Sequence, residues 1–160
     1  MPDAFFVYGT LKRGQANYPL LAPYARAVLP ATARGQLRDL GLFPALVDAA
    51  GVVRGELIRI ESAAMPAALA IIDALEGYDP ADPAGSMYVR RVIPVRPGDG
   101  ADEDAYAYFY NRDPAGLTPV PELPPLGGVA GGGWAATSRS TALCWVAALT
   151  PAMGPAQCTP

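Results

Sequence analysis

Histidine is absent from the 160 residues, and lysine occurs only once, as Lys12. Without histidine the chain has no Ser–His or Cys–His nucleophilic pair and no metal site with a histidine ligand. The two cysteines, Cys144 and Cys158, are too few for a zinc cage and give little evidence of a disulfide framework. Any acid–base chemistry is therefore left to carboxylates and tyrosines.

Long apolar runs are missing as well. The longest one near the C-terminus covers residues 142–149, whereas a membrane-spanning helix needs about 20 residues. The first residues lack the basic and apolar parts of a signal peptide. The net charge is −3 and the eleven arginines are scattered, apart from Arg90-Arg91, so no basic patch for nucleic acid is expected. We expect a cytoplasmic protein without a membrane or nucleic-acid partner.

The composition predicts one globular domain followed by a tail. About half of the residues are apolar and 17% are charged, as in folded proteins. Residues 113–160 carry three of the 27 charges but eight prolines and seven glycines. We therefore place a domain at residues 1–112 and a Pro/Gly-rich tail at 113–160, in which residues 141–149 have the pattern of one short element.

The hydrophobic periodicity predicts several strands and one clear helix. The strands are expected at residues 4–8, 31–37, 40–47, 52–60, 87–95 and 105–110. The helix is expected to begin at Ser62 as N-cap and to run through Leu75, with Pro66 in its first turn and Gly77 as its stop. The last two strands are expected to form an antiparallel pair around a turn at residues 97–100.

The first strand leads directly into the turn Gly9-Thr10-Leu11-Lys12. A glycine without Cβ lets a ligand approach the backbone closely, and the N–H groups after a strand are available to a carboxylate or carbonyl oxygen. This stretch is either a main-chain cradle for a ligand or an ordinary turn between a strand and a loop.

Glu76 continues the apolar stripe of the expected helix. Met65, Leu69, Ile72 and Glu76 are spaced four, three and four residues apart, which places them on one helix face. A carboxylate on a buried face is desolvated, its pKa rises, and it becomes a better base near neutral pH. The alternative is that the last helical turn frays and Glu76 points to solvent.

Other carboxylates and tyrosines compete for a functional role. We expect Glu56 to pair with an arginine across the sheet, and Asp73 and Asp79 to serve the helix surface and the following turn. Tyr106, Tyr108 and Tyr110 alternate with Ala107 and Phe109, so they share one strand face. That face is either a row of ligand-facing hydroxyls or ordinary aromatic packing.

Taken together, these stretches resemble the gamma-glutamylcyclotransferase-like family, which includes gamma-glutamylamine cyclotransferases and AIG2-like proteins. The matching stretches, within residues 4–112, are Val7-Tyr8-Gly9-Thr10-Leu11, Gly41-Leu42-Phe43-Pro44-Ala45-Leu46, Gly55-Glu56-Leu57, Leu75-Glu76-Gly77-Tyr78, Met87-Tyr88-Val89-Arg90-Arg91 and Ala105-Tyr106-Ala107-Tyr108-Phe109-Tyr110. Family members usually end the domain with an Asp-Trp pair, where this chain has Gly133-Trp134.

The resemblance implies an α+β fold, a small mixed β-barrel with flanking helices, that converts a gamma-glutamyl amine or peptide into 5-oxoproline without a cofactor or metal. It implies Glu76 as the catalytic acid/base. Substrate-binding residues would be Tyr8, Gly9, Thr10, Leu11, Tyr106 and Tyr88. Two alternatives stay open, a non-catalytic small-ligand binding module and a hydrolase that uses water as nucleophile. The amine attached to the gamma-glutamyl group and the oligomeric state are left open as well.

Overall fold

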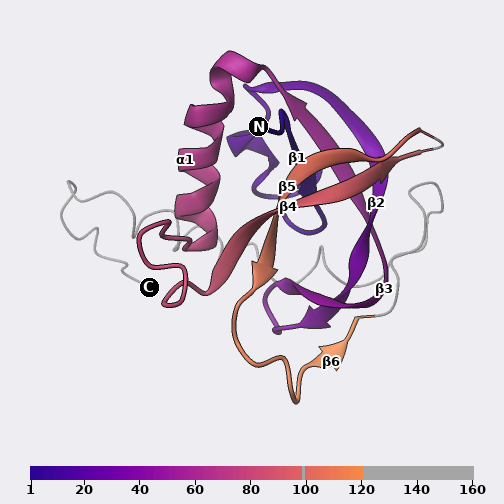
Figure 1. Cartoon of the computed structure of the whole chain (residues 1–160), viewed down its shortest axis with the longest axis vertical. Helices are drawn as coiled ribbons and strands as arrows, with labels where there is room; N and C mark the ends of the chain where they lie inside the picture. The colour runs from indigo at the N-terminus through magenta and orange to yellow at the C-terminus, as the bar shows by residue number, and fades with distance from the viewer. Residues whose placement is uncertain (99, 121–160) are drawn as a thin grey trace, which may run out of the picture. The chain divides into compact units, whose positions relative to one another are not determined.

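The computed structural model describes residues 1–98 and 100–120 (Figure 1). The expected short element at 141–149 and Trp134 lie outside these residues. In chain order the elements are β1 (Ala4–Val7), η1 (Tyr18–Leu20), β2 (Ala25–Asp39), β3 (Pro44–Ile60), η2 (Ser62–Ala64), α1 (Met65–Glu76), β4 (Tyr88–Pro97), β5 (Glu103–Tyr110) and β6 (Thr118–Pro119). The described part of the chain thus contains one α-helix, which lies beside the strands in Figure 1.

Five of the strands close into a mixed barrel. The order is β3-β1-β5-β4-β2, and an additional pairing of β2 with β3 closes the ring. β1 and β5 run parallel, with Phe5 opposite Tyr106, and the other neighbours are antiparallel. The expected pair of late strands is confirmed as β4 and β5. The predicted mixed barrel is thereby confirmed.

The sheet has two apolar faces, because alternate residues of each strand point in opposite directions. On β5, Ala105, Ala107 and Phe109 belong to the barrel interior, where they meet Phe6 and Leu57. Tyr106 and Tyr108 are buried on the other face with the apolar side of α1, and Tyr110 packs against them. The predicted alternation of this strand is confirmed.

The N-cap of the helix is Ala64, two residues later than predicted. Ser62 opens a 3-10 turn instead of capping α1, and its hydroxyl donates a hydrogen bond to Asp3 Oδ2 at 2.8 Å. Pro66 lies in the first turn of α1, as expected. Gly77 ends the helix in the left-handed conformation (φ 63°), which confirms the predicted stop.

The strands at residues 31–37, 40–47 and 52–60 are parts of one long hairpin rather than separate segments. Residues Ala25 to Asp39 of β2 pair with β3, and one of two register shifts falls between Arg34 and Gln36, inside the strand expected at residues 31–37. Gly35 and Gly51 absorb this irregularity at φ values of 145° and 151°. Pro44 begins β3, a position where a proline costs no ladder hydrogen bond.

Residues after the expected boundary at 112 still contact the barrel. β6 pairs with Arg38 and Asp39 of β2, and the Val120 N–H donates to Leu37 O at 2.9 Å. The extent of the Pro/Gly-rich tail stays a prediction. No helix within the described ranges has the length and apolar character that crossing a membrane requires.

Candidate functional site

Glu76 is the last residue of α1, at the end of the buried stripe formed by Met65, Leu69 and Ile72. Its side chain is half-buried, and within residues 1–98 and 100–120 no hydrogen bond or ion pair reaches its carboxyl group. Burial raises the pKa of the Glu76 carboxyl from 4.5 to about 7. The predicted inward orientation thus gives an acid that is half-ionised near neutral pH.

Two tyrosine hydroxyls lie within electrostatic reach of Glu76. Burial raises the pKa of Tyr8 and of Tyr88, and the charge of Glu76 raises both further. Both hydroxyls therefore stay protonated at neutral pH and can act as neutral hydrogen-bond donors. Tyr8 uses its proton within the fold, because its OH donates to Tyr108 O at 2.7 Å.

The topology places these three residues at the same end of the barrel. Tyr8 follows the end of β1. Because β5 runs parallel to β1, the C-terminal ends of both strands lie at the same end of the barrel. Tyr88 begins β4 opposite Tyr110, the last residue of β5, and therefore lies at the same end of the barrel. Glu76 ends the helix that packs on the outer face of the barrel, where Tyr88 is also buried. Tyr8 belongs to the barrel interior, and the charge of Glu76 raises the pKa of both tyrosines from this end of the barrel.

The loop after β1 is held mainly by its own hydrogen bonds. Lys12 N–H donates to Gly9 O at 3.1 Å, and Asn17 bonds Thr10 twice, from N–H to O and from Nδ2 to Oγ1, both at 2.9 Å. Leu11 anchors the loop with a buried side chain. Among the described residues, the N–H groups of Gly9, Thr10 and Leu11 have no acceptor. Three adjacent N–H groups without an acceptor are compatible with the expected main-chain cradle, whose binding role stays a prediction.

Gly9 also has a packing role, beside the close approach of a ligand that stays a prediction. Its φ is not positive, so the backbone conformation does not itself demand glycine. A Cβ at this position would lie 3.1 Å from Cγ and 3.5 Å from Cδ of Pro44. The absence of a side chain therefore allows the start of β3 to pack against the loop.

Tyr106 is not brought to Glu76 by any contact in the structure. Its ring lies 5.9 Å from that of Phe5, and the guanidinium of Arg90 lies 5.3 Å from its centroid. A binding role for Tyr106 stays a prediction.

Asp73 carries a network that its predicted place on the helix surface did not suggest. Its carboxylate accepts a hydrogen bond from Tyr108 OH at 2.6 Å and pairs with Arg90. Arg90 lies between the rings of Tyr78 and Tyr106, 5.3 Å from each centroid. The surface interpretation of Asp73 is wrong, because residues 17 and 35 positions later in the chain fold onto this helix face.

Glu56 also differs from its expected role. It is buried, with 6% exposure, and its Oε2 accepts a hydrogen bond from the main-chain N–H of Arg13 at 2.7 Å. No arginine side chain within residues 1–98 and 100–120 pairs with Glu56, so the predicted cross-strand partner is not found there. No sequence periodicity indicates this bond, because the donor belongs to an irregular loop.

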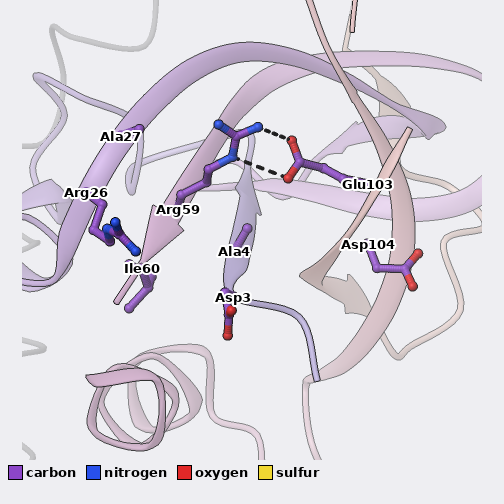
Figure 2. Close-up of a pocket in the computed structure, with 8 residues that line it drawn as sticks. All are labelled: Asp3, Ala4, Arg26, Ala27, Arg59, Ile60, Glu103 and Asp104. Carbon is purple, nitrogen blue, oxygen red and sulfur yellow. Dashed lines mark hydrogen bonds and ion pairs between the residues drawn. The ribbon is translucent and has the colours of Figure 1, made fainter. Parts of the chain in front are cut away.

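A surface groove of about 470 Å³ lies elsewhere (Figure 2). It is lined by charged and small residues: Asp3, Ala4, Arg26, Ala27, Arg59, Ile60, Glu103 and Asp104. Arg59 donates two hydrogen bonds to Glu103, at 2.7 and 3.3 Å, and Arg26 pairs with Glu61 at 3.2 Å. The groove includes the first residue of β1, whereas Tyr8 follows its last residue, and it contains none of the candidate residues.

Comparisons with known proteins identify the family of the chain. The family described as gamma-glutamyl cyclotransferase, AIG2-like, matches residues 5–136. A gamma-glutamylcyclotransferase family protein, ytfP of Citrobacter rodentium, is 33% identical over 113 residues, which are 71% of this chain and 86% of that protein.

Solved structures show the same fold. The solution structure of ytfP from Escherichia coli is 30% identical, with a TM-score of 0.51, and the match covers 74% of this chain and 92% of that one. YkqA from Bacillus subtilis is 25% identical with a TM-score of 0.53; the match covers 75% of this chain but only 38% of the YkqA chain. By the extent of the family match and the identity to ytfP, the chain belongs to the gamma-glutamyl cyclotransferase, AIG2-like family.

Proposed function

We propose that this protein is an enzyme that releases 5-oxoproline from a gamma-glutamyl amine or peptide, with Glu76 as acid/base. The observation that carries the proposal is the half-buried Glu76 carboxyl, whose pKa is raised to about 7 and which lies within electrostatic reach of Tyr8 and Tyr88. A base with a pKa near the working pH is effective in both directions of proton transfer.

The substrate supplies its own nucleophile. The ionised Glu76 takes a proton from the substrate α-ammonium, and the freed amine attacks the γ-carbonyl carbon of the same molecule. The bond from that carbon to the leaving nitrogen then breaks, and protonated Glu76 returns the proton to the leaving amine. The attacking nitrogen still carries one proton more than a lactam nitrogen, and the ionised Glu76 takes this second proton and passes it to the released amine. The products are 5-oxoproline and the protonated amine, and Glu76 is ionised again.

The loop after β1 supports the binding part of the proposal. The free N–H groups of Gly9, Thr10 and Leu11 would hold the α-carboxylate of the substrate, which fixes the chain in a curled conformation. Holding a tethered nucleophile in the reactive geometry can lower the activation free energy by about 7–11 kcal/mol. The neutral hydroxyl of Tyr88 would line the same site.

The test is a panel of gamma-glutamyl amines and gamma-glutamyl dipeptides, with release of 5-oxoproline as readout. For the best substrate, Glu76→Gln should lower kcat by about 10²-fold or more, because the variant keeps the size of the side chain but removes the base. The control is Glu61→Gln, which changes an exposed carboxylate on the segment that leads into η2. Release of free glutamate would indicate a hydrolase, and a Glu76→Gln variant within about threefold of the parent would refute the role of Glu76.

Cytoplasmic location belongs to the same proposal. A gamma-glutamyl compound made inside the cell would then be the substrate.

A further inference from the structure

The buried carboxylate of Glu56 has no function in the proposed reaction. It lies in the last third of β3, opposite Val7 of β1 and Pro30 of β2. Within the described residues no cation pairs with it, and its one hydrogen bond comes from Arg13 N–H. Burying a carboxylate that has no cationic partner is unfavourable, so a residue of this kind needs a reason beyond packing.

The partner of Glu56 provides that reason. Arg13 directly follows the segment Gly9–Lys12, in which three N–H groups are free. The other bonds of this loop connect its own residues, such as Asn17 to Thr10. The bond from Arg13 to Glu56 instead joins the loop backbone to the barrel across 43 residues of sequence. A carboxylate is a strong acceptor for a backbone N–H, so this bond holds the loop firmly.

Gly55 brings Glu56 close enough to make the bond. A Cβ on Gly55 would lie 2.3 Å from Val7 O and 2.8 Å from two ring atoms of Phe6. β3 therefore approaches the end of β1 more closely than any residue with a side chain at position 55 would permit. The carboxylate of the next residue then reaches the loop that follows β1.

We propose that Glu56 is a positioning residue, which fixes the loop at residues 9–13 so that its free N–H groups point together toward the substrate carboxylate. The inference rests on the proposed function for the identity of the substrate, but not for the geometry of the loop. Glu56 acts through the backbone of Arg13 and does not touch the reacting atoms.

The test compares Glu56→Ala with Glu56→Gln in the full chain. The amide oxygen of glutamine still accepts a hydrogen bond, whereas alanine does not. In Glu56→Ala, hydrogen exchange at the Arg13 amide, measured by NMR, should become about tenfold faster or more. KM for the best gamma-glutamyl substrate should rise about tenfold or more while kcat falls less than threefold. Glu56→Gln should restore both quantities to within about threefold of the parent, and Glu61→Ala is the control with an exposed carboxylate.

The outcomes separate this inference from the proposed function. Hydrogen exchange needs no substrate, so it remains decisive if no gamma-glutamyl compound is turned over. Unchanged exchange at Arg13 in Glu56→Ala, or a lower melting temperature with unchanged KM, would overturn the positioning role. A Glu56→Gln variant as defective in KM as Glu56→Ala would also overturn it, because the charge and not the hydrogen bond would then matter.

Discussion

The ionisation of Glu76 should control turnover. The proposed first step needs the ionised carboxylate, and burial raises the pKa of this group to about 7. We expect kcat/KM to rise with pH and to reach half of its plateau near pH 7. A pH profile between 5 and 9 with the best gamma-glutamyl substrate measures this. A rate that is flat from pH 5 to 8 would contradict the prediction.

The same group should make stability depend on pH. The folded-state pKa of Glu76 lies above the unfolded value of 4.5, so the folded protein binds more protons between pH 4.5 and 7. The contribution of this group to the free energy of unfolding is therefore most favourable below pH 4.5 and is lost as pH rises through 7, by about 3 kcal/mol.

Glu76→Gln removes the ionisable group, and with it the loss of stability that ionisation of the buried carboxyl causes at high pH. The variant should be more stable than the parent at pH 8, and the difference should shrink toward pH 5, as urea unfolding at both pH values would show. Equal stability of variant and parent at pH 8 would mean that the Glu76 carboxylate is well solvated in the folded state.

At the scale of elements, the bonds of Asp73 fasten the end of α1 to β4 and β5. Tyr108 OH donates to the Asp73 carboxylate at 2.6 Å, and the Arg90 guanidinium completes the network. Tyr108 also accepts, through its main-chain O, the hydroxyl proton of Tyr8. The network therefore sets the position of Glu76, one turn after Asp73, relative to the loop that follows β1.

Tyr108→Phe should lower the free energy of unfolding by about 1.5–3 kcal/mol, because a hydrogen bond to a charged group is lost. Asp73→Asn should cost a similar amount, since Arg90 loses its carboxylate. The double variant should cost less than the sum, because the two residues share one interaction. Tyr110→Phe is a matched control, expected within about 0.5 kcal/mol of the parent. Fully additive costs would show that Asp73 and Tyr108 act independently.

At the scale of the whole molecule, the question is where the folded domain ends. A chain ending near Gly128 should stay folded and active, since it keeps every contact of the described residues. A chain ending at Arg112 should be less stable, because it loses β6, the Val120 bond to Leu37 and the bond from Arg38 Nη1 to Leu117 O at 3.3 Å. Melting temperatures of both truncations measure this. Insolubility of the longer truncation would place part of residues 129–160 in the core.

Local features of the protein were determined by the sequence itself. The spacing of Met65, Leu69 and Ile72 predicted both the helix and the inward direction of Glu76, and Gly77 marked its end. The alternation at Tyr106–Tyr110 predicted the two faces of β5. These inferences succeeded because side-chain direction in a helix or strand depends on neighbours within a few residues.

Contacts between distant residues were decided by the tertiary structure. The free N–H groups of the loop, the bond of Glu56 to Arg13 and the network of Asp73 depend on which strands become neighbours and in which register. Val7 opposite Glu56, and the parallel alignment of β1 with β5, set these contacts. A hydrogen bond between residues 35 or 43 positions apart leaves no periodic trace in a sequence, because its two ends are brought together by the packing of α1 on β5 and by the pairing of β1 with β3.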